Sequence, residues 1–559
     1  MDKIIISSGD FLKNAGIVGL VHLLEIANAK ENDVYGLSAD GQNLWIAREF
    51  AKHADWTDMY FKAFVEQYGQ TTAYQAVLDK IEIILERAER EDFKRADYKE
   101  DLKFINDKLL SNSYRSGFEN IKEAVEDAKA YELLRTSKLK ENMETEELCA
   151  RLWQLREFLE QPLCEETFSM KSIIYNNINR FWDGKSFLLR ANAAKDMKNV
   201  FDADFSEPLR RYAAAGHEKA KELCIDCSGK MDAKEKVSIA FMKDQADDLS
   251  RKRSAFWNCK VDAWICPVCA FVYALVPLGF TLTGRNFVFI NRNLSVKELL
   301  RANSVHSNLV KESKRDTEEK YSTWIARTID VLLQEKTQEL GNIQVISRGM
   351  GESDRYTFDV ISKDVLKLLE DKNIRKDMER LSKYSIIKTG KDYWNLHEKV
   401  ILNVLRYRSQ YTVINQLLKT ALDSRERETT LYRAALVYDI QLRTSLLSKN
   451  RKTGGALMNR YRVRDEGYEL RNVLLGAKGT SDDACIRGTV YQLLNALSVG
   501  NVEHFMEIIM RVYCSTKLQV PNAFIEFLKD KDTFVEYGYA FLLGLQGSHY
   551  EKKEEITNE

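Results

Sequence analysis

The 559-residue chain has few prolines and histidines, five and seven respectively, and its formal net charge is zero. Scarce proline together with abundant Leu, Glu, Lys and Ala indicates a mainly helical protein, because proline interrupts helices and the other four favour them. Zero net charge gives no global sign of a nucleic-acid-binding protein. The most apolar run, residues 268–280, is too short to span a bilayer. No signal-peptide pattern opens the chain. We therefore expect a soluble, cytoplasmic protein.

Short catalytic motifs are also missing. The chain contains no Walker A loop, GxGxxG fingerprint, HExxH helix or GxSxG elbow. No histidine stands within four residues of another histidine or of a cysteine. Carboxylates are abundant, but they follow helical charge patterns and no pair stands out for acid–base chemistry. We expect a protein that is not an enzyme, and we keep an active site assembled from distant residues as an alternative.

Two paired-cysteine motifs are the strongest chemical signal in the chain. Cys224 and Cys227 form the first CxxC, and Cys266 and Cys269 form the second. A CxxC in a tight turn brings two thiolates to one metal ion, and two such turns complete a tetrahedral site. The motifs predict a structural Zn²⁺ ion, because four protein ligands leave no coordination position for a substrate. Unpaired core cysteines and a redox pair are the alternative interpretations.

The segment between the two pairs is longer than in a compact zinc finger. It is highly charged, with a predicted helix over 234–252, and then becomes aromatic. A metal ion would hold the ends of this segment together and offset the entropy of closing the loop. Cys259 lies in the same segment, either as a substitute ligand or as a partly buried bystander. The five cysteines outside the two pairs are scattered, which indicates a reducing compartment.

Apolar periodicity divides the chain into mainly helical regions. Residues 11–29 predict a buried helix in which Gly16 and Gly19 permit close packing. After the second CxxC, residues 271–282 and 287–291 are rich in β-branched and aromatic side chains, which predicts a hairpin. Further helices are expected at 358–370 and 392–407. Amphipathic stretches near the end predict a small helical bundle; they lie at 490–497, 502–513, 523–528 and 534–545.

These patterns predict a mainly α protein with a smaller β-containing zinc-knuckle region, an α+β arrangement, and a C-terminal helical bundle. We expect four domains: a mostly helical N-terminal domain, the zinc-knuckle and hairpin region, a helical connecting region and the C-terminal bundle. Their predicted bounds are 1–165, 166–345, 346–457 and 458–559. Charge is unevenly distributed, since residues 81–166 hold 22 acidic and 15 basic side chains and residues 398–471 hold 8 and 15. The second segment is either a solvated helical surface or a surface for an anionic partner.

Taken together, four features resemble the CRISPR-associated CXXC–CXXC family, the large subunit of type I-B Cascade. They are the N-terminal Gly-Asp-Phe-Leu-Lys-Asn-Ala-Gly-Ile-Val-Gly-Leu, the two CxxC motifs, the predicted hairpin ending in Phe-Val-Phe-Ile-Asn, and the helical C-terminus. The resemblance implies a subunit of an RNA-guided surveillance complex that recognises the protospacer-adjacent motif in duplex DNA. It also implies help with R-loop formation and recruitment of the helicase-nuclease. The implied partners are crRNA, target duplex DNA, Cascade backbone subunits, small helical subunits and the helicase-nuclease, without a membrane.

The family pattern does not fix the residues that contact nucleic acid, so the candidates come from side-chain chemistry. Arginine suits guanine edges and asparagine suits adenine or the minor groove. At the hairpin turn and exit the candidates are Arg285, Asn286, Asn291, Arg292 and Asn293. Turn formation and surface solvation are the alternative roles for this group. The resemblance also suggests that a basic stretch follows a nucleic-acid backbone through Arg460, Arg462, Arg464 and Arg471.

In related complexes a small helical subunit can be translated from inside the large-subunit gene. Gly454-Gly455 can be encoded by a ribosome-binding sequence shortly before the Met458 codon. We therefore hypothesise internal initiation at Met458, and a glycine loop before a helix is the alternative. For the whole chain, two other functions stay open: a zinc-ribbon RNA-binding or assembly scaffold unrelated to CRISPR, and an enzyme whose site is invisible in the sequence.

Overall fold

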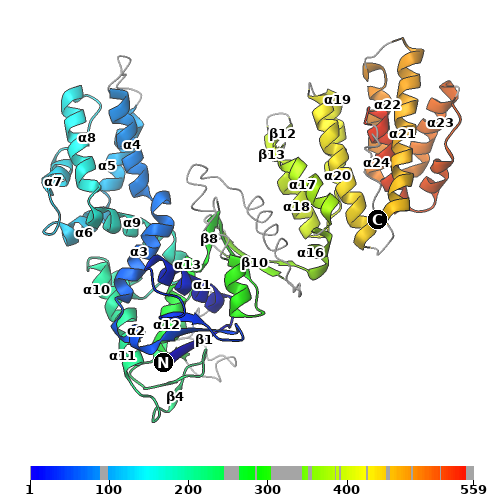
Figure 1. Ribbon diagram of the computed structural model, residues 1–559. Coiled ribbons are helices and arrows are strands. Elements are labelled where there is room, and N and C mark those ends of the chain that lie inside the picture. Colours follow the sequence, from blue (N-terminus) through cyan, green and yellow to red (C-terminus); the bar gives the residue numbers. More distant parts are fainter. Residues whose placement is uncertain are drawn as a thin grey trace. The chain divides into compact units, whose positions relative to one another are not determined.

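The computed structural model describes most of the chain and divides it into two compact units (Figure 1). Unit 1 comprises Met1–Thr317 and Gln344–Asp359, and unit 2 comprises Glu318–Ile343 and Val360–Glu559. The described residues are 2–88, 98–243, 263–283, 286–303, 343–349, 355–369, 371–383, 386–389, 392–423, 426–448, 453–479, 483–516 and 518–548. Within them the structure is mainly helical with small antiparallel sheets, which confirms the predicted fold class.

Unit 1 begins with a small sheet and the buried helix α1 (Phe11–Ile26). The sheet has the antiparallel order β1-β3-β2 and is built from β1 (Lys3–Ser7), β2 (Tyr35–Leu37) and β3 (Asn43–Ala47). Asp10 starts α1, because its carboxylate accepts hydrogen bonds from the backbone N–H groups of Leu12 and Lys13. The helix agrees with the one predicted from periodicity.

Helix α1 packs on α12 (Pro267–Ala274) and α13 (Val276–Gly279). A Cβ atom added to Gly16 would lie 2.3 Å from the carbonyl oxygen of Val272, and one added to Gly19 would lie 2.3 Å from that of Leu275. Only glycine permits this approach of one backbone to another. The structure therefore confirms that the two glycines serve close packing.

Residues after the second CxxC correct the predicted hairpin. The stretch 271–282 is helical as far as Gly279, in α12 and α13, and only β8 (Thr281–Thr283) is a strand. The helix forms because Cys266 occupies the N-cap position and Pro267 the first turn. Strand β9 (Asn286–Asn291) pairs with β8 as expected, and the sheet continues as β11-β10-β9-β8 through β10 (Ile343–Gly349) and β11 (Tyr356–Ile361).

The described residues of unit 1 include two hydrophobic cores, and one of them joins residues from both sides of the predicted boundary at residue 165. One core joins residues 4–68 with residues 170–346. The other lies within 74–168. The second core belongs to α4 (Ala73–Ala88), α5 (Lys99–Leu109), α6 (Asn112–Ile121), α7 (Lys129–Thr136), α8 (Thr145–Leu159) and α9 (Pro162–Asn176). The first core also includes α2 (Arg48–His53), α3 (Trp56–Tyr68), α10 (Met197–Phe201) and α11 (Glu207–Ala214).

The described part of unit 2 is mainly helical and includes one short hairpin, formed by β12 (Ile386–Thr389) and β13 (Asp392–Asn395). Two predicted helices begin later than expected, because residues 356–361 form β11 and residues 392–395 form β13. The helices are α16 (Lys363–Leu369), α17 (Lys372–Lys383), α18 (Leu396–Leu405), α19 (Tyr411–Asp423), α20 (Arg427–Ser448), α21 (Thr453–Ala477), α22 (Arg487–Val499), α23 (Val502–Ser515) and α24 (Lys531–Leu545). No helix among the described residues is long and apolar enough to cross a membrane.

The C-terminal bundle extends beyond the predicted domain 458–559. Helix α21 begins at Thr453, so Gly454 and Gly455 lie in its first turn and not in a loop. Helices α19 and α20 pack on α21, α22 and α24. The Tyr438 hydroxyl on α20 donates to the carbonyl oxygen of Glu536 on α24 at 2.9 Å. The bundle therefore includes two helices that precede Met458.

Candidate metal centre and polar surfaces

The structure brings the four cysteines of the two CxxC motifs together, as their spacing predicts. Their Sγ atoms all lie within 4.8 Å of one another, and those of Cys227 and Cys266 are 3.7 Å apart. Tetrahedral zinc with Zn–S bonds of about 2.3 Å would place its sulfur ligands about 3.8 Å apart. All four cysteines are free thiols. The donor set and its spacing fit one thiolate-bound metal ion.

The first cysteine pair lies in a tight turn after β4 (Glu222–Leu223), and β4 pairs with β5 (Lys230–Met231). The Cys224 N–H donates to the carbonyl oxygen of Gly229 at 2.9 Å, and the Gly229 N–H approaches the Cys227 sulfur at 3.4 Å. Ser228 adopts φ +57° to close the turn. The turn therefore aims both thiols inward, although Cys227 stays exposed to solvent.

The second pair is presented by α12, where Cys266 is the N-cap residue and Cys269 lies in the first turn. Two short strands, β6 (Val237–Ser238) and β7 (Trp264–Ile265), hold this segment beside the first turn. The Ile225 N–H donates to the carbonyl oxygen of Trp264 at 3.1 Å. Backbone hydrogen bonds thus fix the two turns relative to each other. Cys259 and the predicted helix beyond residue 243 lie outside the described residues, whereas 234–243 form β6 and a short 3₁₀ turn.

Four neighbouring thiols perturb one another's protonation. Hydrogen bonds from the other three cysteines lower the pKa of Cys224, and hydrogen bonds with Cys224 and Cys227 raise the pKa of Cys266. The cluster thus favours thiolate character at some of its sulfurs at the expense of the others. A bound cation would extend that preference to all four sulfurs, because metal ligation requires thiolates.

A buried ion pair from α1 lies directly behind the first CxxC. Lys13 Nζ is 3.1 Å from the Asp226 carboxylate, and the two side chains are only 3% and 13% exposed. Burial alone would lower the pKa of Lys13, but the charges of Asp226 and Cys269 outweigh that effect and raise it. Burial raises the pKa of Asp226 despite its partner. Lys13 thus supplies positive charge next to a cluster that would carry excess negative charge when metal-bound.

Sequence reasoning missed this ion pair. The available signal was a single lysine near the start of a mostly apolar helix, because a buried lysine requires a partner. Its partner, however, lies 213 residues away. The same face of unit 1 holds a hydrogen bond from the Tyr273 hydroxyl to the Asp10 carboxylate, so the cap of α1 is also tied to α12.

The predicted nucleic-acid residues of the hairpin occupy different environments. Arg285 lies outside the described residues, and Asn286 is half-buried at the start of β9. Arg292 is 4% exposed and forms an ion pair with Glu298 at 3.0 Å. Asn291 is half-buried and Asn293 is exposed. Of the described members, the two asparagines at the exit of β9 are thus better placed for an external ligand than Arg292.

Three of the four arginines predicted to follow a nucleic-acid backbone instead hold unit 2 together. Arg460 lies 2.8 Å from Glu536 of α24, and Arg471 lies 2.6 Å from Asp483. Arg464 donates hydrogen bonds to Ser548. These guanidinium groups face the bundle because positions 460, 464 and 471 share one face of α21. Arg462 faces solvent, with a side chain that is 82% exposed.

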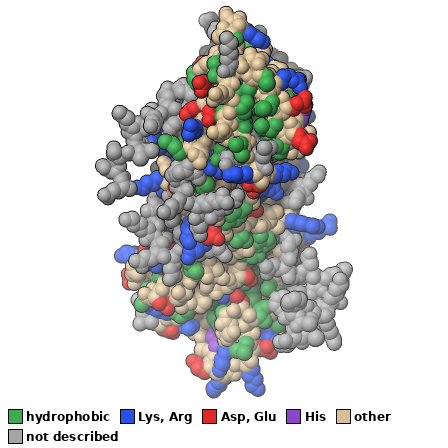
Figure 2. Space-filling model, turned by 90° about the vertical axis from the view of Figure 1, so that its right-hand side faces the viewer, with side chains coloured by type: hydrophobic (Ala, Val, Ile, Leu, Met, Phe, Trp, Pro, Cys, Tyr) green, Lys and Arg blue, Asp and Glu red, His purple; other side chains and the backbone are tan. Residues whose placement is uncertain are grey.

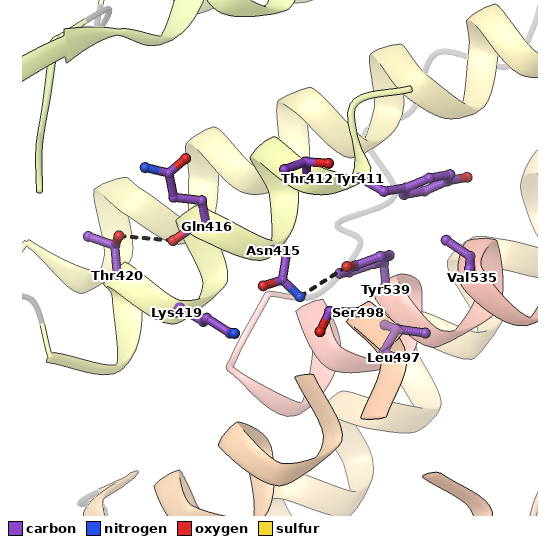
Figure 3. Close-up of a pocket in the computed structure, with 10 residues that line it drawn as sticks. All are labelled: Tyr411, Thr412, Asn415, Gln416, Lys419, Thr420, Leu497, Ser498, Val535 and Tyr539. Atoms are coloured by element: carbon purple, nitrogen blue, oxygen red, sulfur yellow. Dashed lines mark hydrogen bonds between the residues drawn. The ribbon is translucent and has the colours of Figure 1, made fainter. Parts of the chain in front are cut away.

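A groove of about 660 Å³ lies between α19, α22 and α24 (Figure 3). Its lining contains amides, hydroxyls and the ammonium group of Lys419, but no carboxylate, histidine or cysteine among the described residues. Asn415 donates to the Tyr539 hydroxyl at 3.0 Å, and the rings of Tyr411 and Tyr539 stack. The groove therefore lacks a recognisable general base or an activated nucleophile.

Unit 2 also exposes apolar side chains, including Tyr491, Val499, Met510 and Ile525. Figure 2 shows hydrophobic side chains gathered in the upper part of the view, between acidic and basic ones. Apolar groups bordered by charges are typical of surfaces that contact other proteins.

Comparison with protein families gives a match that falls on the candidate metal centre. No curated protein and no solved structure shows significant similarity to the chain. Residues 217–281, which contain both CxxC motifs, match the model of a family described as CRISPR-associated protein (Cas_CXXC_CXXC). The match covers the two cysteine turns, the strands between them and helices α12 and α13. The region around the metal centre is therefore similar to CRISPR-associated CXXC–CXXC proteins, and this similarity supports a CRISPR-associated protein.

Proposed function

We propose that the chain is the large subunit of an RNA-guided CRISPR surveillance complex of the type I-B Cascade class. In this role it recognises the protospacer-adjacent motif in duplex DNA, aids R-loop formation and recruits the helicase-nuclease. The observation that carries the proposal is the clustering of four thiols inside the segment that matches the CRISPR-associated family. The features of the N-terminus and C-terminus that resemble the family give the proposal its finer detail.

The metal ion in this proposal is zinc, and its role is structural. Cys224, Cys227, Cys266 and Cys269 would hold it, with Lys13 and Asp226 behind them. Four thiolates saturate tetrahedral zinc, so the ion would supply cross-linking and not Lewis-acid chemistry. Helix α1 closes one side of the cysteine cluster, and the beginning of α12 presents Cys266 and Cys269. This arrangement supports a subunit that recognises DNA without catalysing a reaction.

In such a complex, guide RNA pairing selects the target sequence, and the protein contacts the adjacent motif and the backbone. The proposed partners are therefore crRNA, target duplex DNA, the Cascade backbone subunits, small helical subunits and the helicase-nuclease, in the cytoplasm. The exposed apolar groups of unit 2 support contact with other proteins. Arg460, Arg464 and Arg471 pack inside unit 2, so we do not expect them to contact the nucleic-acid backbone. On α21, Arg462 stays a candidate for such a contact.

Purification of the tagged chain from its native cell, followed by RNA sequencing and metal analysis, tests the proposal. We expect discrete guide RNA that contains repeat sequence and one zinc ion per chain. Zinc without guide RNA would favour a zinc-ribbon scaffold unrelated to CRISPR. Turnover of a substrate by the purified chain alone would instead favour an enzyme.

A further inference from the structure

A relay of side-chain amides connects the buried side of α1 with the exit of β9. Asn14, which has no exposed surface, donates from Nδ2 to Asn291 Oδ1 at 2.8 Å, and Asn293 Oδ1 and the Gly9 carbonyl oxygen each accept from the same group at 3.3 Å. Asn291 in turn donates from its Nδ2 to Gln344 Oε1 on β10 at 2.9 Å. The three amides that follow Asn14 come from the same edge of unit 1 and lie at or near the surface.

The backbone of Gly9 fixes the direction of every hydrogen bond in this relay. The Gly9 N–H donates to Asn14 Oδ1 at 2.9 Å, and a backbone N–H is always a donor. Asn14 must therefore place its oxygen toward Gly9 N, and its NH₂ group toward the oxygens of Asn291 and Asn293. The same logic then orients Gln344. Amide orientation, which is normally assigned from the surroundings, is here determined by the main chain.

The outer ends of the relay are consequently donors. Asn293 and Gln344 use their oxygens inside the relay and keep their NH₂ groups for other partners. Among the described residues, neither NH₂ group has a hydrogen-bond acceptor. Asn293 is exposed and Gln344 is half-buried, so both groups can reach a ligand.

We infer that this relay is a sequence-reading element that presents two amide donors to the acceptor edge of a base pair in duplex DNA. The inference rests on the proposed function and specifies its substrate contact. Acceptor edges are adenine N3 and thymine O2 in the minor groove, or guanine N7 and O6 in the major groove. An adenine contact in the major groove needs a donor and an acceptor from one amide, and the relay has already used the acceptors. Gln344 enters as a new specificity residue, and Asn14 as a residue that positions it.

The experiment measures binding of the complete guide-loaded complex to duplexes that carry a matched target beside a randomised triplet. We expect Gln344→Met and Asn293→Ala to reduce discrimination between triplets by about 5- to 150-fold, the usual range for one base contact. Gln154→Met is the control, because Gln154 is an exposed amide on α8, in the other core of unit 1. It should leave discrimination unchanged.

Base analogues distinguish the two grooves. Weaker binding to 3-deazaadenine assigns the donors to the minor groove, and weaker binding to 7-deazaguanine assigns them to the major groove. Binding that neither analogue changes, or triplet preference that both relay variants preserve, would overturn the inference while leaving the proposed function intact. A wild-type complex that binds no duplex would overturn both.

Asn14→Asp tests the positioning role with almost no change in volume. A carboxylate at this position can only accept, so Asn291 and Asn293 must turn their NH₂ groups inward and Gln344 must present its oxygen. We expect the preferred triplet to change toward donor edges, a result that simple destabilisation would not produce. If the Asn14→Asp variant does not fold, the Gln344→Met result still decides the inference.

Discussion

Substitution of Lys13 by Met should loosen the metal centre from behind, without touching a ligand. Methionine keeps most of the lysine volume but leaves the Asp226 carboxylate buried and unpaired. Removing one partner of a buried ion pair costs about 3–5 kcal/mol, because the remaining charge is neither hydrated nor neutralised. The two charged groups are 3.1 Å apart and nearly inaccessible to solvent. The free energy of unfolding of unit 1 should therefore fall by about 3–5 kcal/mol.

The double variant Lys13→Met/Asp226→Asn should recover more than half of this loss, since no unpaired charge remains. Release of metal to a coloured chelator during a urea titration reports on unit 1 directly. Lys52→Met is the matched control, because its ion pair with Glu49 lies on the surface and is worth less than about 1 kcal/mol. Equal losses in the single and double variants would refute the electrostatic explanation and would leave only a packing role for Lys13.

Three further predictions concern unit 2. Gly544→Ala should destabilise unit 2 by about 1–3 kcal/mol, because the new Cβ would overlap the Arg464 carbonyl oxygen. The control Gly476→Ala has nothing within 4 Å of the new Cβ and should be neutral or stabilising. Hydrogen exchange of the α21 amides measures both effects. Burial raises the pKa of Asp439 from 3.8 to about 6. The contribution of this group to stability is therefore fully present below pH 3.8 and is lost as the pH rises through about 6. Asp439→Asn should therefore stabilise unit 2 at neutral pH by up to about 3 kcal/mol and make its free energy of unfolding depend less on pH. Chemical denaturation at several pH values measures this, and an unchanged pH dependence would contradict the prediction. The isolated fragment 458–559 should be helical by circular dichroism but should melt at a lower temperature than unit 2 in the whole chain, because it loses hydrogen bonds from α19 and α20.

The long periodic elements and the clustering of the four cysteines could be predicted from the sequence. Helix α1 and the cysteine cluster follow from local patterns, namely apolar spacing and CxxC turns. Residues 271–279 were assigned wrongly because a short run that is apolar on all sides has no period to separate helix from strand. The local signal that favoured a helix was Pro267, because proline is well suited to the first helical turn.

Charge patterns were the least informative part of the sequence. The basic segment 398–471 left open a solvated surface or an anionic partner, but Arg460 within it pairs with Glu536, 76 residues later, inside the bundle. The partners of Lys13 and Asn14 are likewise more than 200 residues away. Pairing at such distances depends on the tertiary fold, which local composition does not encode.

The discontinuous first core of unit 1 also has a consequence for synthesis. Helix α1 is almost wholly buried, yet the helix that covers it follows much later, and the bonded residues Asp10 and Tyr273 are 263 positions apart. At about 5–20 residues per second, a ribosome needs about 13 to 50 s to make that interval. Throughout this time α1 can pack on α3, but the part of its apolar surface that α12 and α13 cover has no partner. The nascent chain therefore needs protection by a chaperone, or fast folding of the 74–168 core beside it, until the second cysteine pair emerges.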